Sequence, residues 1–318
     1  MKLSIRSLAA FFLSSTLTAC ALAEDAPAGH RFMAQDKGHI AIISAKGDVE
    51  WEVPCNYTSH DMWLLPNGNY LLHTAAAKIT EMTPDKKVVW EYESKPTPEN
   101  KQHVEVHAFQ RLENGNTMIS ESGNGRIIEV DKEGKIVKEL NLTLDHPSAH
   151  SDTRLVRKLE NGHYLVAHEN DGCVREYDDA GKVVWTYKLG LNDRPAAGGH
   201  GVEGHGDHVY SAVRLPSGNT LIGCGNGNRV IEVTPEGNVV WSVEQKELPG
   251  ITLAWVTMVQ LLPNGNILIS NCHAGPTNPQ LIEVTREKKV VWSMNDQKNL
   301  GNSTAASMLL DVQGKVLR

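Results

Sequence analysis

Histidine and arginine side chains recur at equivalent places along the 318-residue sequence, which contains 14 histidines. Their positions can be aligned on the glycine of a tight turn that occurs six times. Imidazole groups serve as general acids, general bases or nucleophiles, and a guanidinium group neutralises a developing negative charge. A cluster of both types therefore indicates chemistry on an anionic substrate. Eight residues before the six glycines stand His60, His107, Arg154, Tyr210, Thr257 and Ala306.

The most unusual segment is residues 197–208, AGGHGVEGHGDH, inside the one long insertion of the repeat. Insertions on one face of a repeat array usually mark the binding face. A single histidine of this kind is more often structural, so the hypothesis of a site depends on the cluster as a whole. The predicted catalytic set is His60, His107, Arg154 and His208. The predicted substrate-binding set is His103, His150, Tyr210, Trp255, His200 and His205.

Cysteines form a second group, and three of them fall in corresponding loops of successive repeats. Cys272 and His273 are adjacent and Cys224 lies one repeat earlier, so these three side chains are a candidate site for Zn or Cu. No CxxC or HExxH spacing accompanies them. A disulfide between Cys224 and Cys272 and free thiols are the alternatives. The cysteines beyond residue 24 are Cys55, Cys173, Cys224 and Cys272.

The elements that must position these residues are short strands joined by glycine turns. A two-residue turn with glycine at the position that needs positive φ is the strongest short-range signal of a β-hairpin. The turn glycines are spaced by 47, 47, 56, 47 and 49 residues, and this period with several strands per unit predicts a β-propeller. The turns are Asn67-Gly68, Asn114-Gly115, Asn161-Gly162, Ser217-Gly218, Asn264-Gly265 and Gln313-Gly314.

A second motif, valine-valine-tryptophan or a close variant, closes each unit and also occurs six times. Its first copy precedes any complete unit, and the sixth glycine turn follows the last complete one. We therefore predict an all-β, six-bladed β-propeller with four-stranded blades. In the closing blade, residues 304–318 are expected to supply two inner strands and residues 39–53 two outer strands. The complete blades are expected at 60–92, 106–140, 150–187, 207–243 and 255–294.

The loop lengths separate the two faces of this ring. Turns from the first to the second strand and from the third to the fourth are short, whereas the His-rich segments lie in the remaining connections. We therefore expect one plain face and one face that carries the chemistry. Two repeated features are interpreted as structural, because tryptophans suit packing between blades and a glutamate column suits hydrogen bonds between blades. The column is Glu81, Glu129, Glu176, Glu232 and Glu283.

Residues 1–23 are typical of an export signal, with Lys2 and Arg6 before an apolar core and small residues at a cleavage site. The segment that ends at Cys20 also fits a lipobox, so we expect a periplasmic or secreted protein, either soluble or lipid-anchored. Residues 24–318 are expected to form a single propeller domain, and the protein is expected to be a monomer. The net charge of −7 without a basic run argues against a nucleic-acid partner, and no later segment is typical of a membrane span.

The stretch Gly-Lys-Val-Val-Trp at residues 181–185 resembles the PQQ-like propeller repeat, and the Leu-Pro-Asn-Gly-Asn turns resemble those of bacterial arylsulfotransferase-type propellers. This resemblance covers nearly all of residues 30–318 and implies an exported six-bladed propeller. In the arylsulfotransferase family, channel-mouth histidines, one a transient sulfuryl acceptor, act with an arginine that holds the sulfate. PQQ itself is not expected, because its dehydrogenases carry adjacent cysteines and this chain has none. Residues of the matching types are His60, His107, His150, His208 and Arg154.

Two functions are compatible with these observations. The first is an exported enzyme that acts on an anionic small molecule or oligosaccharide at the channel mouth, by sulfuryl transfer or by lyase- or hydrolase-type chemistry. The second is a non-catalytic propeller that binds a ligand, a metal ion or a protein through the same face. The His-rich insertion argues against a third interpretation, a structural scaffold alone.

Overall fold

Glycine at the tight turns determines where the first strand of each blade ends and the second begins. In a computed structural model of the protein, which describes residues 29–318, Gly68, Gly115 and Gly162 have φ angles of 84°, 86° and 88°. Glycine adopts this left-handed region without steric cost. The amide of Gly68 donates to the carbonyl oxygen of Leu65 at 2.9 Å, and this bond closes the turn.

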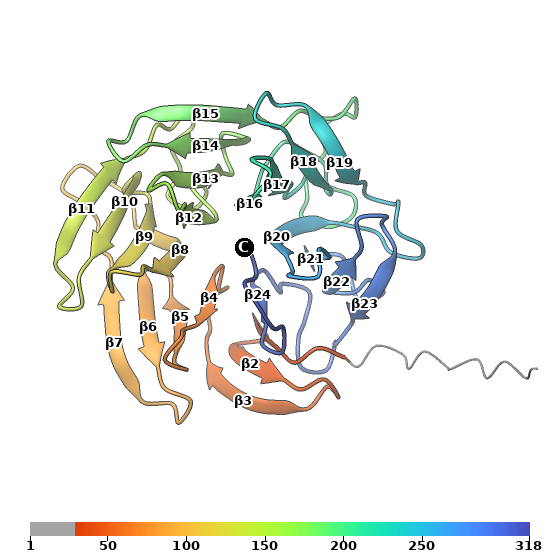
Figure 1. Ribbon diagram of the computed structural model, residues 1–318, viewed down its shortest axis with the longest axis horizontal. Coiled ribbons are helices and arrows are strands. Elements are labelled where there is room, and N and C mark those ends of the chain that lie inside the picture. The colour runs from red at the N-terminus through yellow and green to blue at the C-terminus, as the bar shows by residue number, and fades with distance from the viewer. Residues whose placement is uncertain (1–28) are drawn as a thin grey trace, which may run out of the picture.

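Six four-stranded antiparallel sheets form a ring (Figure 1), which confirms the predicted all-β six-bladed propeller. No helix occurs in residues 29–318. The first strand of each complete blade lies nearest the axis and the fourth lies at the rim.

The first complete blade contains β4 (Met62–Leu64), β5 (Tyr70–Ala75), β6 (Lys78–Met82) and β7 (Val88–Glu93). The second contains β8 (Glu105–Arg111), β9 (Thr117–Ser122), β10 (Arg126–Val130) and β11 (Ile136–Asn141). The third contains β12 (Val156–Lys158), β13 (Tyr164–His168), β14 (Cys173–Tyr177) and β15 (Val183–Lys188). The fourth contains β16 (Ser211–Arg214), β17 (Thr220–Gly223), β18 (Val230–Val233) and β19 (Val239–Val243). The fifth contains β20 (Trp255–Leu261), β21 (Ile267–Cys272), β22 (Leu281–Val284) and β23 (Val290–Met294).

The closing blade combines strands from the two ends of the chain, as predicted, but divides them differently. The prediction of two inner strands from residues 304–318 is wrong, because an N-terminal strand takes the second place and pairs Met33 with Met308. This strand is followed by Lys37-Gly38, a turn in which both residues have positive φ but which lacks the Asn-Gly pattern of the others. From the axis outward, the blade contains β24 (Ser307–Leu309), β1 (Phe32–Asp36), β2 (His39–Ile43) and β3 (Val49–Pro54).

The repeated tryptophans connect neighbouring blades. The indole N–H of Trp90 donates to the carbonyl oxygen of Lys132 at 3.0 Å, and that of Trp241 donates to the carbonyl oxygen of Arg286 at 2.7 Å. The Arg286 guanidinium also lies 4.7 Å from the centroid of the Trp241 ring, a favourable cation–π contact. The structural interpretation of these tryptophans is confirmed.

The glutamate column is structural as well. Glu232 accepts a hydrogen bond from the side chain of Asn219 at 2.6 Å, in its own blade, and pairs with Arg286 of the next blade. Glu81 likewise pairs with Arg111 of the next blade at 2.8 Å. Each of these carboxylates therefore ties its own blade to the one that follows.

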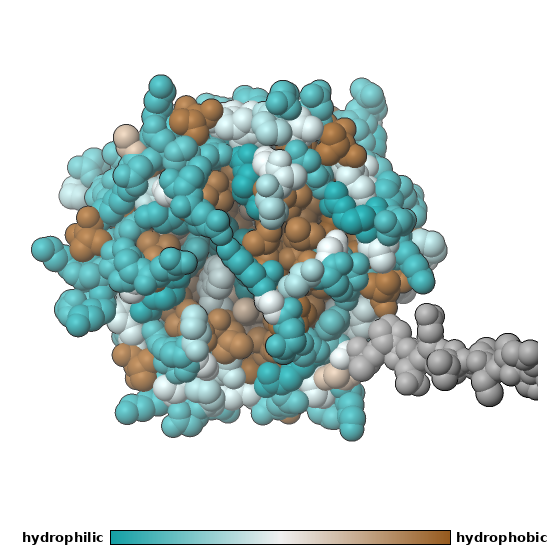
Figure 2. Space-filling model, viewed as in Figure 1, coloured by the Kyte–Doolittle hydropathy of each residue, from teal (hydrophilic) through white to brown (hydrophobic). Residues whose placement is uncertain are grey.

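The inner strands fix the two faces of the ring. β8 begins at Glu105 and ends at Arg111, and at about 3.3 Å per residue these ends lie about 20 Å apart. We call the face that carries Glu105 the long-loop face and the face that carries Arg111 the short-turn face. The C-terminal end lies at the centre of the ring in Figure 1. Figure 2 shows the molecule hollowed there, with hydrophobic side chains visible in and around the hollow and mostly hydrophilic side chains toward the rim.

The expected export signal of residues 1–23 and the lipobox at Cys20 lie outside the described residues. Within residues 29–318, no helix is long and apolar enough to cross a membrane.

Candidate functional site

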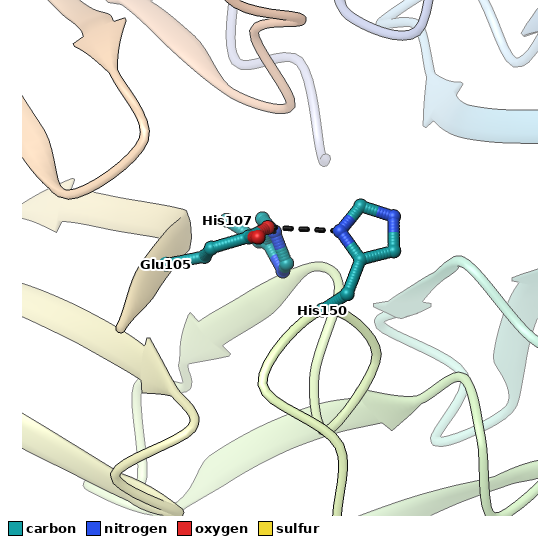
Figure 3. A group of neighbouring side chains, drawn as sticks. All are labelled: Glu105, His107 and His150. Atoms are coloured by element: carbon teal, nitrogen blue, oxygen red, sulfur yellow. Dashed lines mark hydrogen bonds and ion pairs between the residues drawn. The ribbon is translucent and has the colours of Figure 1, made fainter. Parts of the chain in front are cut away.

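Glu105, the first residue of β8, is the centre of a hydrogen-bonded cluster on the long-loop face. Its Oε2 atom lies 2.8 Å from the Tyr57 hydroxyl and 2.9 Å from both His107 Nε2 and His150 Nδ1. Its Oε1 atom lies 2.7 Å from His103 Nε2. Figure 3 shows that His150 reaches this carboxylate from the loop of the next blade. Burial alone would raise the pKa of Glu105, but these hydrogen bonds outweigh it and hold the pKa well below its ordinary value.

His107 is fully buried and faces an acceptor on each side of its ring. Its Nδ1 atom lies 2.8 Å from the carbonyl oxygen of Thr153, and its Nε2 atom lies 2.9 Å from Glu105. Burial, followed by the charge of Arg154, lowers the pKa of His107. A neutral imidazole has one N–H and satisfies only one of the two acceptors. A proton or a metal cation between His107 Nε2 and the Glu105 carboxylate would satisfy the second acceptor. His107 and Glu105 are therefore suited to proton transfer or to metal binding.

Arg154 joins two of the histidines to a second carboxylate. Its Nη1 atom lies 3.3 Å from His107 Nε2, and its Nη2 atom lies 3.1 Å from His150 Nε2. Its Nε atom pairs with Glu169, and both of these side chains are buried. Burial opposes the charged form, but the Glu169 carboxylate outweighs it and raises the pKa of Arg154. A permanent cation therefore lies against the free nitrogen of His150.

His60 and Tyr210 lie beside this network. His60 Nδ1 is hydrogen-bonded to the Tyr210 hydroxyl, and the ring centroids of His60 and His107 are 4.6 Å apart. The Arg154 guanidinium lies 5.6 Å from the centroid of the Tyr210 ring. Burial lowers the pKa of His60 well below its ordinary value and raises the pKa of Tyr210 well above it. Both side chains are therefore neutral at physiological pH, and they contribute hydrogen bonds rather than charge.

The His-rich insertion brings a second group of rings to the same face. His208 Nδ1 lies 3.6 Å from Glu169 Oε1, on the carboxylate that also pairs with the buried arginine. The centroid of the Trp255 ring lies 6.0 Å from that of His208 and 4.4 Å from that of His200. The His200 ring lies 5.3 Å from that of His273. These rings form a continuous series of contacts that starts at Glu169.

Exposure differs among these residues and decides which of them a ligand can meet. The side chains of His150, His103 and His208 are 62%, 64% and 34% exposed. His205 is buried, and its Nε2–H donates to the carbonyl oxygen of Leu191 at 2.7 Å, so it holds the insertion in place. The predicted site residues that are also buried are His60, His107, Arg154, Tyr210 and Trp255.

The structure does not bring the expected metal ligands Cys224, Cys272 and His273 into one ligand set. Cys272 Sγ lies 2.9 Å from His273 Nδ1, whereas Cys224 packs in a separate apolar cluster. The four cysteines of residues 29–318 are buried and free, so the alternative Cys224–Cys272 disulfide is not formed. A different group of candidate metal ligands has all its ligand atoms within 4.8 Å of one another. It consists of Glu105, His107 and His150.

Sequence reasoning missed three members of the cluster, Glu105, Tyr57 and Glu169. A signal for Glu105 is present, because residues 103–107 read HVEVH and the strand period of two places their polar side chains on one face. No comparable signal marks Tyr57 or Glu169, which reach the cluster from other segments.

The structure is a six-bladed β-propeller with a histidine–glutamate cluster on one face. The chain matches no family model and no curated protein. A protein of unknown function from Bacteroides caccae is similar in structure, with a TM-score of 0.72 and 22% identity over 88% of this chain and 98% of that one. A catalytically inactive histidine-to-alanine variant of virginiamycin B lyase from Staphylococcus aureus, solved with quinupristin, has a TM-score of 0.55 and 13% identity over 86% and 87% of the two chains. The WD40 β-propeller domain of Doa1 has a TM-score of 0.53 and 16% identity over 75% and 70%. At these identities the similarity establishes the β-propeller fold alone, and not the PQQ-like or arylsulfotransferase-like type.

Proposed function

We propose that the protein is a lyase-type enzyme that removes a proton next to the carboxylate of an anionic substrate on the long-loop face. The observation that carries this proposal is the geometry of His150. Its Nδ1 atom lies 2.9 Å from the Glu105 carboxylate, and its Nε2 atom lies 3.1 Å from Arg154 Nη2. Its side chain is largely exposed. One carboxylate thus orients a solvent-accessible imidazole beside a fixed cation.

The contact with Glu105 assigns the tautomer of His150. Because the ionised carboxylate only accepts hydrogen bonds, Nδ1 carries the proton and Nε2 presents its lone pair. A carboxylate in this position keeps the base aligned and stabilises the imidazolium that forms when it takes a proton. His150 therefore fits the role of general base.

Arg154 supplies the complementary charge. Proton loss next to a carboxylate develops further negative charge on the substrate, and a preorganised guanidinium in a water-poor site stabilises that charge. Since Arg154 is buried and held at Nε by Glu169, its Nη atoms are directed at His107 and His150. A substrate carboxylate would replace the contact between Arg154 and His150 and so free Nε2 for the reaction.

The elimination balances with two histidines. His150 Nε2 accepts the proton, the C–H electron pair forms the new double bond, and the bond to the leaving oxygen breaks with its electron pair. The leaving oxygen takes a proton from the imidazolium form of His208, which lies beside Glu169 at the Nε edge of the arginine. Imidazole groups give and take protons near neutral pH, so both steps suit this residue type.

A substrate for this reaction carries a carboxylate beside the acidic C–H bond and an oxygen substituent on the next carbon. A 4-linked uronide has this arrangement, and it belongs to the anionic oligosaccharides that the sequence favours. Streptogramin B lyases share the fold, which is compatible with lyase chemistry on a propeller. The proposal rests on the geometry of His150 and not on that likeness.

The test is a matched pair of histidine variants assayed on 4-linked uronides, in which elimination creates a conjugated double bond that absorbs ultraviolet light. His150→Ala should lose about 100-fold or more of the activity, because a general base contributes at least that much. His146→Ala is the control. The side chain of His146 is 69% exposed in the same loop, but its Nδ1 atom lies 3.4 Å from Asp171 Oδ1 and it makes no contact with Glu105 or Arg154 among the hydrogen bonds and ion pairs of residues 29–318. Equal activities of the two variants would overturn the proposal, and turnover of sulfate esters alone would favour sulfuryl transfer.

A second candidate function, metal binding, is favoured by the group Glu105, His107 and His150. The Nδ1–H of His107 donates to the Thr153 carbonyl oxygen, which is how many metal-bound histidines are oriented. Arg154 opposes a divalent ion, because its charge touches both imidazoles. Calorimetric titration with Zn²⁺ distinguishes the two functions. A metal site should bind Zn²⁺ more tightly in Arg154→Gln, whereas an acid–base site should show no stoichiometric binding in either protein.

We also propose that the protein is exported and acts in the periplasm or outside the cell. The support is the sequence of residues 1–23, with its basic start, apolar core and small residues. Cell fractionation of the full chain tests this, and Cys20→Ser separates a lipid anchor from simple secretion. Membrane-associated protein that becomes soluble in Cys20→Ser indicates the anchor. Uncleaved protein in the cytoplasm would contradict export.

A further inference from the structure

The short-turn face, where the sequence predicts only hairpin closure, contains a cavity of about 920 Å³. It is lined by the first turns of the second, third and fourth complete blades and by residues 315–318. Its lining has six basic and three acidic side chains. The basic residues are Arg111, Arg157, Lys158, Arg214, Lys315 and Arg318.

Two buried arginines of this cavity share one carboxylate. Arg157 Nη1 lies 2.7 Å from Asp61 Oδ2, and its Nη2 atom lies 3.0 Å from Asp61 Oδ1. Arg318 Nη2 also lies 3.0 Å from Asp61 Oδ1. Both guanidinium groups lie against the Trp63 ring, at 4.9 Å and 4.5 Å from its centroid. These contacts hold both cations in fixed positions.

Arg157 is fully engaged, whereas Arg318 is not. The remaining nitrogen of Arg157, Nε, donates to the main-chain oxygen of Arg318 at 3.0 Å. The Nε and Nη1 atoms of Arg318 have no hydrogen-bond partner within residues 29–318, although the side chain is only 3% exposed. Burial lowers the pKa of Arg318 to about 10, with Asp61 opposing and Arg157 adding to the effect. Buried donors without an acceptor are unfavourable, so this position favours an incoming acceptor.

We propose that this cavity binds a small oxyanion, a carboxylate or a phosphate group, on the Nε and Nη1 atoms of Arg318. The other cations of the lining already have carboxylate partners of their own. The pairs are Arg111–Glu81, Arg157–Asp61, Lys158–Glu129, Arg214–Glu176 and Lys315–Glu160. Hydrogen bonds between a guanidinium and an oxyanion are charge-assisted and belong to the stronger class. The cavity volume leaves room for a molecule larger than the anionic group itself.

This site is separate from the proposed active site. Arg111 lines the cavity and Glu105 organises the histidine cluster, at the two ends of one strand. Binding at the short-turn face can therefore be measured without any assay of the proposed lyase activity.

Calorimetric titration with inorganic phosphate and with citrate, at constant ionic strength in chloride, tests the proposal. The wild-type protein should bind at least one of the two anions saturably, and the comparison shows whether phosphate or carboxylate is preferred. Arg318→Gln should weaken binding by about tenfold or more, because the charged donors are removed. Lys315→Gln removes a charge from the exposed pair with Glu160 and should change affinity by less than about twofold.

A measurement on the unaltered protein covers the case in which Arg318→Gln does not fold. Crystals soaked with selenate should show anomalous density within hydrogen-bond distance of Arg318 Nε or Nη1. Absence of saturable binding overturns the proposal, as does equal affinity in the wild type and Arg318→Gln. Selenate found only beside Arg154, on the long-loop face, also overturns it.

Discussion

The Nη1 atom of Arg154 lies 3.3 Å from the Nε2 atom of His107, and both side chains are buried. After burial itself, the charge of Arg154 is the largest cause that lowers the pKa of His107. Arg154→Gln should therefore raise the pKa of His107, because it removes the repulsion while Glu105 continues to favour the imidazolium. NMR titration of the histidine ring signals measures this shift, with the His107 signal identified by its loss in His107→Gln.

The same change leaves Glu169 buried without its cation. Arg154→Gln should lower the free energy of unfolding by about 3–5 kcal/mol, as expected for one broken member of a buried ion pair. The double variant Arg154→Gln, Glu169→Gln should recover part of that loss in urea unfolding. Arg214→Gln removes a cation from the short-turn face and is the control. If Arg214→Gln shifted the pKa of His107 as much as Arg154→Gln does, the lowered pKa of His107 would not be due to the charge of Arg154.

Stability should fall as the pH decreases from about 6.5 to about 4. Burial lowers the pKa of His73 and of His168 to about 4, whereas the unfolded chain has a histidine pKa of about 6.5. The unfolded state binds more protons in this window, so the free energy of unfolding decreases as the pH falls. Each histidine should contribute about 3 kcal/mol by about pH 4. Urea unfolding at a series of pH values measures the loss.

His168→Gln is the matched variant for this prediction. It removes one of the titrating groups, so the pH dependence of stability near pH 5 should become shallower by about one proton. An unchanged slope would show that His168 is not held neutral. Glu105 contributes in the more acidic range. Because its pKa is lower in the folded protein than in the unfolded chain, its ionised form stabilises the fold above the unfolded pKa. This stabilisation is lost as the pH falls below the unfolded pKa.

Most of the ring could be predicted because its signals are local. A turn glycine that requires positive φ and a valine-valine-tryptophan strand recur in almost every blade, and both follow from backbone geometry and packing. β1 could not be found in this way. Its turn, Lys37-Gly38, lacks the Asn-Gly pattern, and its partner strand β24 lies at the other end of the chain.

The candidate site could be predicted as residue types but not as a hydrogen-bond network. Counting back from the turn glycines aligns His60, His107 and Arg154, and the structure places them in contact. Whether a histidine faces a carboxylate, as His150 does, or a carbonyl, as His205 does, depends on the paths of the long loops. No periodicity determines those paths, since loops lack a repeating pattern of burial.

The four cysteines of residues 29–318 should be unreactive in the folded protein. Burial raises the pKa of Cys173 to about 11 and that of Cys224 to about 12, so no thiolate forms near neutral pH. In a Cys20→Ser protein, a chromogenic thiol reagent should titrate all four only after unfolding. Dithiothreitol should leave Tm unchanged. A lower Tm in dithiothreitol, or a shortfall of thiols after unfolding, would indicate a disulfide.

Gly204 is in close contact with the carbonyl oxygen of Gly199, and this contact shapes the His-rich insertion. A Cβ atom added at Gly204 would stand 2.2 Å from that oxygen, so Gly204→Ala must displace the segment that carries His200 and His208. Gly198→Ala is the control, because a Cβ atom there meets nothing within 4 Å. We expect faster amide hydrogen exchange across residues 197–208 in Gly204→Ala, with little change in the strands, since the strands of the fourth blade are hydrogen-bonded to one another. Equal exchange in the two variants would mean that the contact does not hold the insertion in place.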